Sequence, residues 1–446
     1  MLEKLSKVPL SFSQIINMNV GFFGIQYSFG LQQSAVTPIY DMLGASPDQI
    51  PLLNLAGPMT GLLIQPIIGA LSDKTWSPKW GRRKPYFLIG AILCSICLFL
   101  FPFSSSLWMA AGLLWILDAG NNTAMEPYRA FIADKLVDDQ KGLGFQAQSF
   151  FTGFGQTLAN VSLFVFPMIF LGKTGSLPTW VYASFFLGAV CSIGTVLWSM
   201  RTTPEIPPTP AELAAIRKEP FSILMPFKEV PAAIRDMPKI MWQLALVYLF
   251  QWYALFCYWQ NSSKSVALSV WGVTPKSDPA AYEQAVSWTG LVNGWYNVVT
   301  FLTAFLLAWL ARKYLAKYVH FLCLMLAGMG FLAFPIISDK YLLFVAISGF
   351  GIGWASMMGI PYLMVVGGIP KERYGVYMGI INMMIVVPML LQTLTFGYIL
   401  DHFLDNDPRN AVTLAGVLLV IAALLTLRIK EHRQLDTDIT MQGTGH

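Results

Sequence analysis

Long runs of apolar residues recur along the whole chain and alternate with shorter polar segments. A helix that crosses the hydrocarbon core of a bilayer needs about 17–25 predominantly apolar residues. Twelve runs meet this requirement, so the pattern predicts twelve membrane-spanning helices. The predicted spans are residues 12–36, 51–72, 84–104, 107–127, 145–171, 178–200, 241–262, 286–310, 318–337, 341–366, 376–400 and 411–428.

Lys and Arg residues between these runs predict the orientation of the helices, because cytoplasmic loops carry an excess of both. If the N-terminus is cytoplasmic, 24 of the 29 basic residues fall in inner segments. The outer segments hold the other five, which are Lys173, Lys264, Lys276, Lys340 and Arg409. An error of one span would scramble this asymmetry, so we expect twelve spans with both termini cytoplasmic.

Residues 201–240 interrupt the hydrophobic pattern after the sixth predicted span. The segment is rich in Pro, carries charges of both signs and is the longest polar connection in the chain. We therefore expect an N-terminal six-helix bundle over 1–200, a cytoplasmic linker over 201–240, a C-terminal bundle over 241–430 and a cytoplasmic tail over 431–446. Two six-helix halves around a central site are the architecture of major facilitator transporters.

Composition narrows the class of protein further. Of the 446 residues, 55% are hydrophobic and 12% are charged, whereas a soluble domain carries roughly 25% charged residues. Composition therefore excludes a soluble enzyme, a secreted disulfide-linked domain and a disordered chain, and the fold class is an all-α membrane protein. The four histidines have no metal-ligand spacing, and the chain has no Walker-type phosphate loop. We expect no enzymatic activity, no metal, no cofactor other than a coupling ion and no nucleic-acid partner.

One carboxylate, Asp118, lies deep within a predicted span. The span starts near residue 107, so at about 1.5 Å per residue Asp118 lies roughly 16 Å into the membrane. Inserting a charged residue at that depth costs about 2.5–3.5 kcal/mol even on the hydrophobicity scale that gives the smallest cost. A charged residue inside a span therefore usually has a function. Burial favours the protonated form, which would let Asp118 load and release a proton in one cycle. The alternative is that neighbouring amides, such as Asn121 and Asn122, hold Asp118 permanently.

Neutral amides and aromatic rings are abundant inside the predicted spans. Amides match hydroxyl groups, and flat rings cover the C–H faces of a sugar, so this set suits a neutral polyol. No deep Arg or Lys is present to bind an anion. For any one of these residues, contact between helices is an equally good explanation. The candidate substrate-binding residues are Gln26, Gln32, Asn121, Asn122, Gln156, Asn160, Tyr253, Trp259 and Asn293.

A group of charged residues is expected at the inner ends of the second to fourth spans. Ion pairs among them could close the inner mouth in one conformation and break when it opens. The candidate cytoplasmic-gate residues are Asp73, Arg82, Arg83, Glu126, Arg129 and Asp134.

Residues 57–87, GPMTGLLIQPIIGALSDKTWSPKWGRRKPYF, resemble the signature of the sucrose–proton symporters. This family belongs to the glycoside–pentoside–hexuronide cation symporter group of the major facilitator superfamily. Three further stretches, 29–44, 117–134 and 374–397, are similar to its first, fourth and eleventh helices. The resemblance therefore covers both halves of the chain.

The resemblance implies proton-coupled symport of a disaccharide, with Asp118 as the proton carrier and Asn121 and Asn122 at the sugar. The resemblance is to a bacterial-type member. Glu126 and Gln33 differ from the residues expected in plant members, which leaves sucrose, maltose and related α-glucosides open as the sugar. The resemblance also implies a multi-pass protein of the plasma (inner) membrane, with sugar, proton and lipid bilayer as partners, that functions as a monomer.

Two other interpretations remain open. A sodium-coupled glycoside symporter could use Asp118 together with Glu126 in a cage of oxygen ligands. A sugar sensor or an intramembrane enzyme that does not transport would belong to a different class. The chain shows neither a nucleophile–base pair nor a long soluble output domain for that class.

Overall fold

The computed structural model describes residues 8–43, 53, 56–175, 177–218, 225–274 and 277–431. Within these residues, twelve helices of 17 to 35 residues each overlap one of the predicted spans. They are α1 (Phe12–Met42), α3 (Ala56–Asp73), α4 (Lys84–Leu100), α5 (Leu107–Lys135), α6 (Asp138–Ile169), α7 (Thr179–Thr202), α10 (Lys239–Val266), α11 (Pro279–Lys313), α12 (Ala316–Ala333), α13 (Leu342–Val366), α14 (Tyr374–Phe403) and α15 (Pro408–Thr426).

Among the described residues, eight helical segments are long and apolar enough to cross a membrane, and they correspond to α4, α7 and α10 to α15. The other four long helices, α1, α3, α5 and α6, hold most of the buried amides of the N-terminal half. The start of the predicted span 51–72 and the predicted tail beyond residue 431 lie outside the described residues.

Short elements join the long helices. Between α6 and α7, β1 (Lys173–Thr174) and β2 (Leu177–Pro178) form an antiparallel pair in which Lys173 faces Pro178. Short helices η1 (Phe101–Phe103), η3 (Phe334–Ile336) and η4 (Lys371–Arg373), and the π-helix η2 (Ala267–Trp271), lie at the ends of α4, α12, α14 and α10. The linker contains two helices that the sequence analysis did not predict, α8 (Pro210–Lys218) and α9 (Pro226–Arg235).

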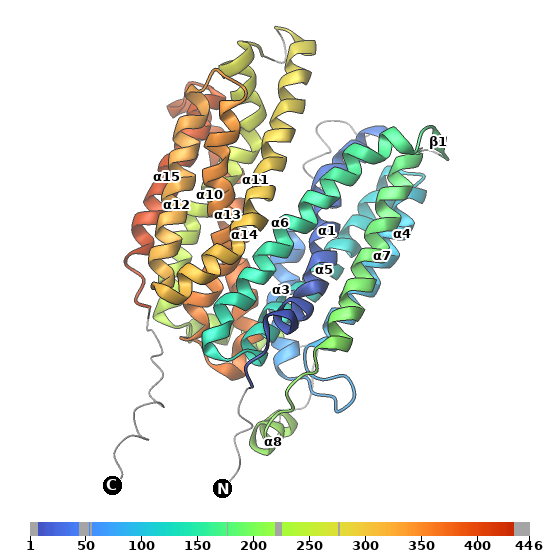
Figure 1. Ribbon diagram of the computed structural model, residues 1–446, viewed down its shortest axis with the longest axis vertical. Coiled ribbons are helices and arrows are strands. Elements are labelled where there is room, and N and C mark those ends of the chain that lie inside the picture. The colour runs from blue at the N-terminus through green and yellow to red at the C-terminus, as the bar shows by residue number, and fades with distance from the viewer. Residues whose placement is uncertain are drawn as a thin grey trace.

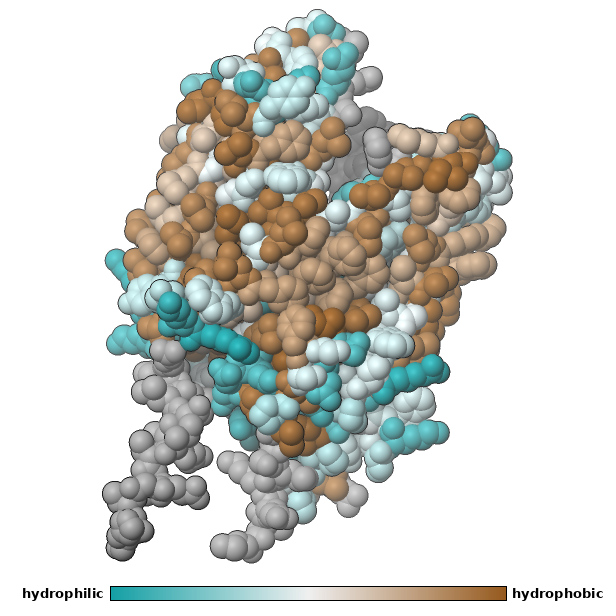
Figure 2. All heavy atoms as spheres, in the orientation of Figure 1, coloured by the Kyte–Doolittle hydropathy of each residue, from teal (hydrophilic) through white to brown (hydrophobic). Residues whose placement is uncertain are grey.

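The long helices form two bundles (Figure 1). In one, α1 packs on α6 and α7, and α4 packs on α5 and α7; in the other, α12 packs on α13 and α15, and α10 packs on α14 and α15. The bundles converge at the end where α8 lies, here called the α8 end, and lean apart at the opposite end. Figure 2 shows the surface notched between the bundles at that opposite end.

Contact between the bundles is made by α3 with α14, α6 with α11 and α13, and α5 with α14. Glycines let the backbones approach closely in the first of these pairs. A Cβ atom on Gly69 would lie 2.2 Å from the carbonyl oxygen of Gly375, and one on Gly379 would lie 2.4 Å from the Cα atom of Pro66. A larger residue at either position would force α3 and α14 apart.

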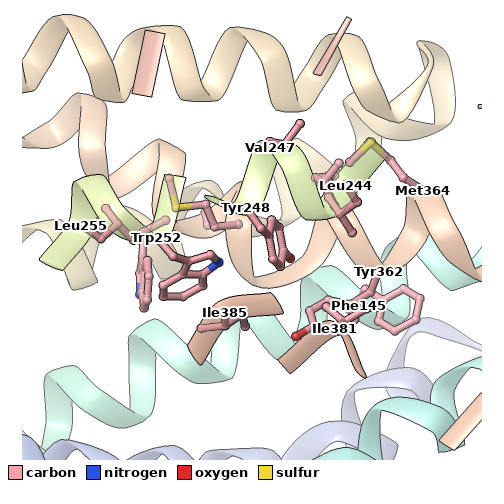
Figure 3. Packing of buried hydrophobic residues seen from close by; sticks show 14 of the residues in the cluster. Phe145, Leu244, Val247, Tyr248, Trp252, Leu255, Tyr362, Met364, Ile381 and Ile385 are labelled. Atoms are coloured by element: carbon pink, nitrogen blue, oxygen red, sulfur yellow. The ribbon is translucent and has the colours of Figure 1, made fainter. Parts of the chain in front are cut away.

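The apolar core continues across this junction. Figure 3 shows side chains of α10, α13 and α14, among them Trp252, Tyr362 and Ile385, gathered near Phe145 of α6. The rings of Phe145 and Tyr362 stack with their centres 5.8 Å apart. Both bundles therefore share one packed core toward the α8 end.

Local sequence explains where several helices begin, and burial explains where one ends. The side chains of Ser106, Asp278 and Asp407 accept backbone N–H groups at the starts of α5, α11 and α15, which satisfies donors that a helix leaves free. Helix α5 continues past Pro127, the predicted end, because residues 128–133 are all buried against the bundle. This extension places Asp118 and the expected gate residues of the fourth span on one continuous helix.

Candidate functional site

The carboxyl group of Asp118 is fully buried in α5 and has two unlike oxygens. Its Oδ1 accepts a hydrogen bond of 2.5 Å from Nε2 of Gln32 on α1. Its Oδ2 has no hydrogen-bond partner in the described part of the chain, and faces Gly57 of α3, where a Cβ atom would still be 3.8 Å away. No cation within the described ranges lies at salt-bridge distance from Asp118, so neither a cation nor a hydrogen bond from these residues offsets charge on Oδ2.

A second buried group, the hydroxyl of Tyr40, lies close enough to Asp118 to interact with it electrostatically. That hydroxyl also lacks a partner among the described residues. Sequence reasoning missed Tyr40 because the predicted first span stopped at residue 36, whereas α1 extends to Met42.

Asn121 and Asn122 extend this site along α5 and tie three helices to it. The Nδ2 of Asn121 donates to the hydroxyl of Ser28 at 3.0 Å, and its Oδ1 accepts from the thiol of Cys94 at 3.1 Å. The Nδ2 of Asn122 donates to the hydroxyl of Thr60 at 3.0 Å. The Oδ1 of Asn122 accepts from Nε2 of Gln65. Asp118 and these amides therefore form one polar region between α1, α3, α4 and α5.

The remaining N-terminal candidates lie between α1 and α6. Nε2 of Gln156 donates to Oε1 of Gln26 at 3.1 Å, and the hydroxyl of Ser34 donates to Oδ1 of Asn160 at 2.7 Å. No hydrogen bond within the described ranges joins these pairs to Asp118. They form a second polar region, between α1 and α6.

The C-terminal candidates sit on α10 and α11 and are partly engaged with neighbours. The hydroxyl of Tyr258 donates to Oδ1 of Asn293 at 2.8 Å. The hydroxyls of Tyr253 and Thr395 are 2.8 Å apart. The ring of Trp259 meets that of Trp354 on α13 edge to face, with centres 5.7 Å apart.

Trp354 is a central residue of this aromatic cluster that sequence reasoning missed. Its ring also meets Trp252 at 5.8 Å, and the indole N–H groups of Trp252 and Trp354 are buried without partners in the described part of the chain. The predicted span 341–366 is rich in Gly, which favours close packing of helices over ligand contact. A large aromatic residue directly after Gly353 was the available signal.

The expected gate residues fall into two groups. In the first, Nη2 of Arg83 binds Oδ1 of Asp73 at 2.7 Å, and Nε of Arg83 binds Oδ2 of Asp134 at 2.8 Å. Nη2 of Arg82 lies 3.7 Å from Oδ1 of Asp73. Burial opposes the charge of Arg83, but the carboxylates of Asp134 and Asp73 outweigh this effect and raise the pKa of Arg83.

Asp73 also joins the two bundles. Its carboxylate oxygens accept the backbone N–H groups of Gly375 and Val376, both at 2.9 Å, in the first turn of α14. A carboxylate is favoured at a helix N-terminus, where free N–H groups and the helix dipole are positive. Asp73 is 3% exposed, so this contact is shielded from water.

The second group is formed by Glu126 and Arg129, which bind each other at 2.6 Å. The guanidinium carbon of Arg129 lies 4.6 Å from the centre of the Tyr362 ring on α13. Both charged side chains are buried. Because Arg129 belongs to one bundle and Tyr362 to the other, this cation–π contact is a second link across the junction.

Glu205, in the linker after α7, is a site residue that sequence reasoning missed. Its carboxylate accepts the backbone N–H groups of Arg82, Arg83 and Lys84 at 2.8, 2.9 and 2.9 Å, at the start of α4. It lines a cavity of about 560 Å³ at the α8 end, between α8, α5 and the start of α14. The signal available was an acidic residue between prolines after the sixth span.

Comparison with known proteins adds a family to this geometry. A sequence profile of the Major Facilitator Superfamily matches residues 18–393. The chain is 24% identical to sucrose transport protein SUT5 of Oryza sativa subsp. indica, over 91% of this chain and 85% of that protein.

Two solved structures share the fold. FucP, a transporter of the same superfamily in its outward conformation, matches with a TM-score of 0.69 and 14% identity, over 94% of this chain and 99% of FucP. XylE, a proton:xylose symporter, matches with a TM-score of 0.65 and 16% identity, over 94% of this chain and 96% of XylE. At these identities the two structures show the fold alone.

Proposed function

Because the chain belongs to the Major Facilitator Superfamily, we propose that it is a secondary active transporter that couples inward movement of protons to uptake of a neutral disaccharide. The family and the fold make it a membrane transporter and not an enzyme. Sucrose, maltose or a related α-glucoside is the proposed substrate. No cofactor is proposed, and the proton is the coupling ion.

The observation that carries this proposal is the environment of Asp118. Its carboxyl group is fully buried, and no cation in the described part of the chain balances its charge. With Oδ1 bound to Gln32, a proton would add to Oδ2 from one side of the membrane and leave from the same oxygen toward the other. Protonation makes the site neutral, so the form that crosses between states avoids a buried charge.

A neutral sugar is supported by the amides beside this carboxyl and by an aromatic cluster of the other bundle. Gln32, Asn121 and Asn122 carry donors and acceptors that are bound to neighbouring side chains, and the indole N–H groups of Trp252 and Trp354 have no partner among the described residues. Hydroxyl-rich ligands need this combination. The names of two relatives agree with it: SUT5 is a sucrose transport protein and XylE a proton:xylose symporter.

A sodium-coupled mechanism is the second candidate, and the geometry favours it less. Such a site would combine Asp118 with a second carboxylate. Glu126 is instead bound by Arg129 at 2.6 Å, and it lies eight residues, or roughly 12 Å, further along α5.

We further propose twelve membrane spans with both termini cytoplasmic, a division into bundles at 1–200 and 241–430 around a linker at 201–240, and a functional monomer in the plasma membrane. In that orientation the α8 end is cytoplasmic, and Asp73 and Arg129 close it through α14 and Tyr362. The structure then corresponds to an outward-facing state. We also propose that the protein is a bacterial-type member. The departures at Gln33 and Glu126 are its only support, because SUT5, the relative compared above, is a plant protein.

Energetics fit a single proton for each sugar. A membrane potential of about 150 mV supplies roughly 3.5 kcal/mol for each charge moved. At about 1.4 kcal/mol for each tenfold change, this sustains a sugar gradient of several hundredfold. A neutral substrate leaves the proton as the only charge carried, so transport should be electrogenic.

Uptake of radiolabelled sucrose and maltose into proteoliposomes tests the function. An inward proton gradient and an inward sodium gradient are imposed separately, and a protonophore is added to each. We expect accumulation with the proton gradient, collapsed by the protonophore. Accumulation that needs sodium and survives the protonophore would support the sodium-coupled candidate, and no accumulation of either sugar would reject disaccharide uptake.

A further inference from the structure

Exposed cations gather at the α8 end around α9, the first turn of α10 and the residues that follow α15. We call them the basic surface, and its members are Lys228, Arg235, Lys239, Arg428 and Lys430, all of which are exposed.

Hydrogen bonds hold the separate segments of the basic surface together. Nε2 of Gln243 on α10 donates to the carbonyl of Arg428 at 3.1 Å, and its Oε1 accepts the N–H of Lys430 at 3.0 Å. Lys239 lies four residues before Gln243, on the same face of α10. Helix α9 ends at Arg235, four residues before Lys239 in the chain. Chain connectivity and these hydrogen bonds therefore link the segments that carry the five cations.

Six cations, the five of the basic surface and Arg373, outnumber the three described carboxylates bound beside them, which are Glu229, Asp236 and Glu431. Arg373, at the start of α14, binds Glu229 at 2.9 Å and Asp236 at 3.3 Å. Glu431 accepts the backbone N–H groups at the start of α12. Arg235 shares Asp236 at 3.6 Å, and the other four cations have no carboxylate within salt-bridge distance in the described ranges.

Two large apolar side chains are exposed beside these cations. Phe227 on α9 is 66% exposed, and Trp242 on α10 is 54% exposed. The candidate membrane span of α10 begins at Lys239, so this region lies where hydrocarbon gives way to water. Figure 2 shows the same boundary, with an apolar lateral belt that ends in hydrophilic residues toward the α8 end.

We propose that the basic surface binds the headgroups of anionic phospholipids, with Phe227 and Trp242 in the interfacial layer. Cations at a membrane boundary attract anionic lipids, and aromatic side chains anchor in the same layer. A soluble polyanion would leave both aromatic side chains exposed to water, whereas a lipid surface buries them. Charge and exposed apolar area together therefore select a lipid.

The position of α9 connects such a lipid to the junction of the bundles. Helix α9 contacts α3 of one bundle and α14 of the other, and Arg373 ties it to the start of α14. A lipid bound at α9 is thus one helix away from the Asp73 contact. The lipid proposal itself does not depend on which substrate the protein transports.

Spin-labelled lipids test the proposal in the full-length protein. Phosphatidylcholine proteoliposomes receive a trace of spin-labelled phosphatidylglycerol or spin-labelled phosphatidylcholine, and electron paramagnetic resonance measures the motionally restricted fraction of each. Each cation near an anionic surface contributes about a fivefold preference. We expect wild-type protein to favour phosphatidylglycerol at least fivefold at low ionic strength.

Matched variants assign that preference to the basic surface. The triple variant K228Q/R235Q/K239Q should lose most of it, whereas K173Q/K264Q/K340Q removes three cations from the opposite end and should keep it. If the triple variant does not elute as a monodisperse protein, the preference for phosphatidylglycerol is measured on the single variant K228E instead. Preference retained in K228Q/R235Q/K239Q or K228E, or lost equally in the control, would overturn the proposal.

Excess inorganic phosphate separates a lipid site from a site for soluble anions. At constant ionic strength, phosphate should leave the restricted phosphatidylglycerol fraction unchanged, because it cannot bury Phe227 and Trp242. Displacement of the lipid by phosphate would show a soluble-anion site and contradict the proposal. The variant F227S should reduce the restricted fraction while retaining all five cations.

Discussion

Replacing Asp73 with Asn should shift the protein away from the conformation in which the bundles meet at the α8 end. Asp73 accepts two backbone N–H groups of α14 and binds Arg83, and all three contacts are shielded from water. Asn has nearly the same shape, but it is neutral and replaces one acceptor oxygen with an N–H₂ group. That group would face the N–H of Gly375 or Val376, donor against donor.

The size of the shift follows from these contacts. A hydrogen bond to a charged group contributes about 1.5–3 kcal/mol, against about 0.5–1.5 kcal/mol for a neutral pair. Two such bonds therefore lose about 2 kcal/mol. The ion pair with Arg83 joins two segments of the same bundle, so its loss is not counted in this ratio. A change of about 2 kcal/mol alters the ratio of the two conformations about 30-fold.

Double electron–electron resonance between labels at the opposite end measures this ratio. Lys173 and Ile336 are exposed there, and each is changed to Cys in a background without the five native cysteines. In Asp73→Asn the distance distribution should shift to shorter values as that end closes. Asp407→Asn is the control, because Asp407 pairs with Arg409 in its own bundle. An unchanged distribution in Asp73→Asn, or an equal shift in Asp407→Asn, would refute the reasoning.

Three further changes probe the same junction. Tyr362→Leu removes the ring under Arg129, so it should shift the same distribution about tenfold toward closure of the opposite end; an unaltered distribution would contradict this. Gly69→Val should force α3 from α14 and increase cysteine labelling at the α8 end, whereas Gly194→Val, with nothing within 4 Å of its Cβ position, should not. Glu205→Gln should lower the free energy of unfolding by about 1–2 kcal/mol, because it weakens three hydrogen bonds at the start of α4. A thermal melt compares this variant with Glu212→Gln in the exposed linker. Equal melting temperatures would argue against a role of Glu205 in capping α4.

Helix positions were predictable because the bilayer imposes the length of an apolar run. Helix ends were not, since tertiary burial extends α1 to Met42 and α5 to Lys135 beyond the apolar runs. These extensions bring Tyr40 to the site and carry the helix of Asp118 down to the charged junction. The hydrophobic pattern cannot predict that a helix continues through a polar segment when a neighbouring helix buries that segment.

Site residues were predictable where their chemistry alone was unusual. Asp118 stands out because a charge in hydrocarbon is costly, and it is indeed buried; its role in coupling stays a prediction. Glu205 and Trp354 were missed because each belongs to the site only through its contacts with a helix far away in the chain, α4 for Glu205 and α10 for Trp354. The six gate residues separate into two groups because Glu126 lies eight residues, or more than two turns of α5, before Asp134.

The central claim is that Asp118 carries the coupling proton, and sugar-induced current tests it most directly. Wild-type proteoliposomes should show inward current when sucrose or maltose is added at a mildly acidic external pH. Asp118→Asn should abolish the current and uphill uptake but retain exchange of sugar across the membrane. Asp278→Asn, whose side chain can still cap α11, should retain both. A sugar-dependent current in Asp118→Asn, or uptake by that variant against a sugar gradient, would contradict the account.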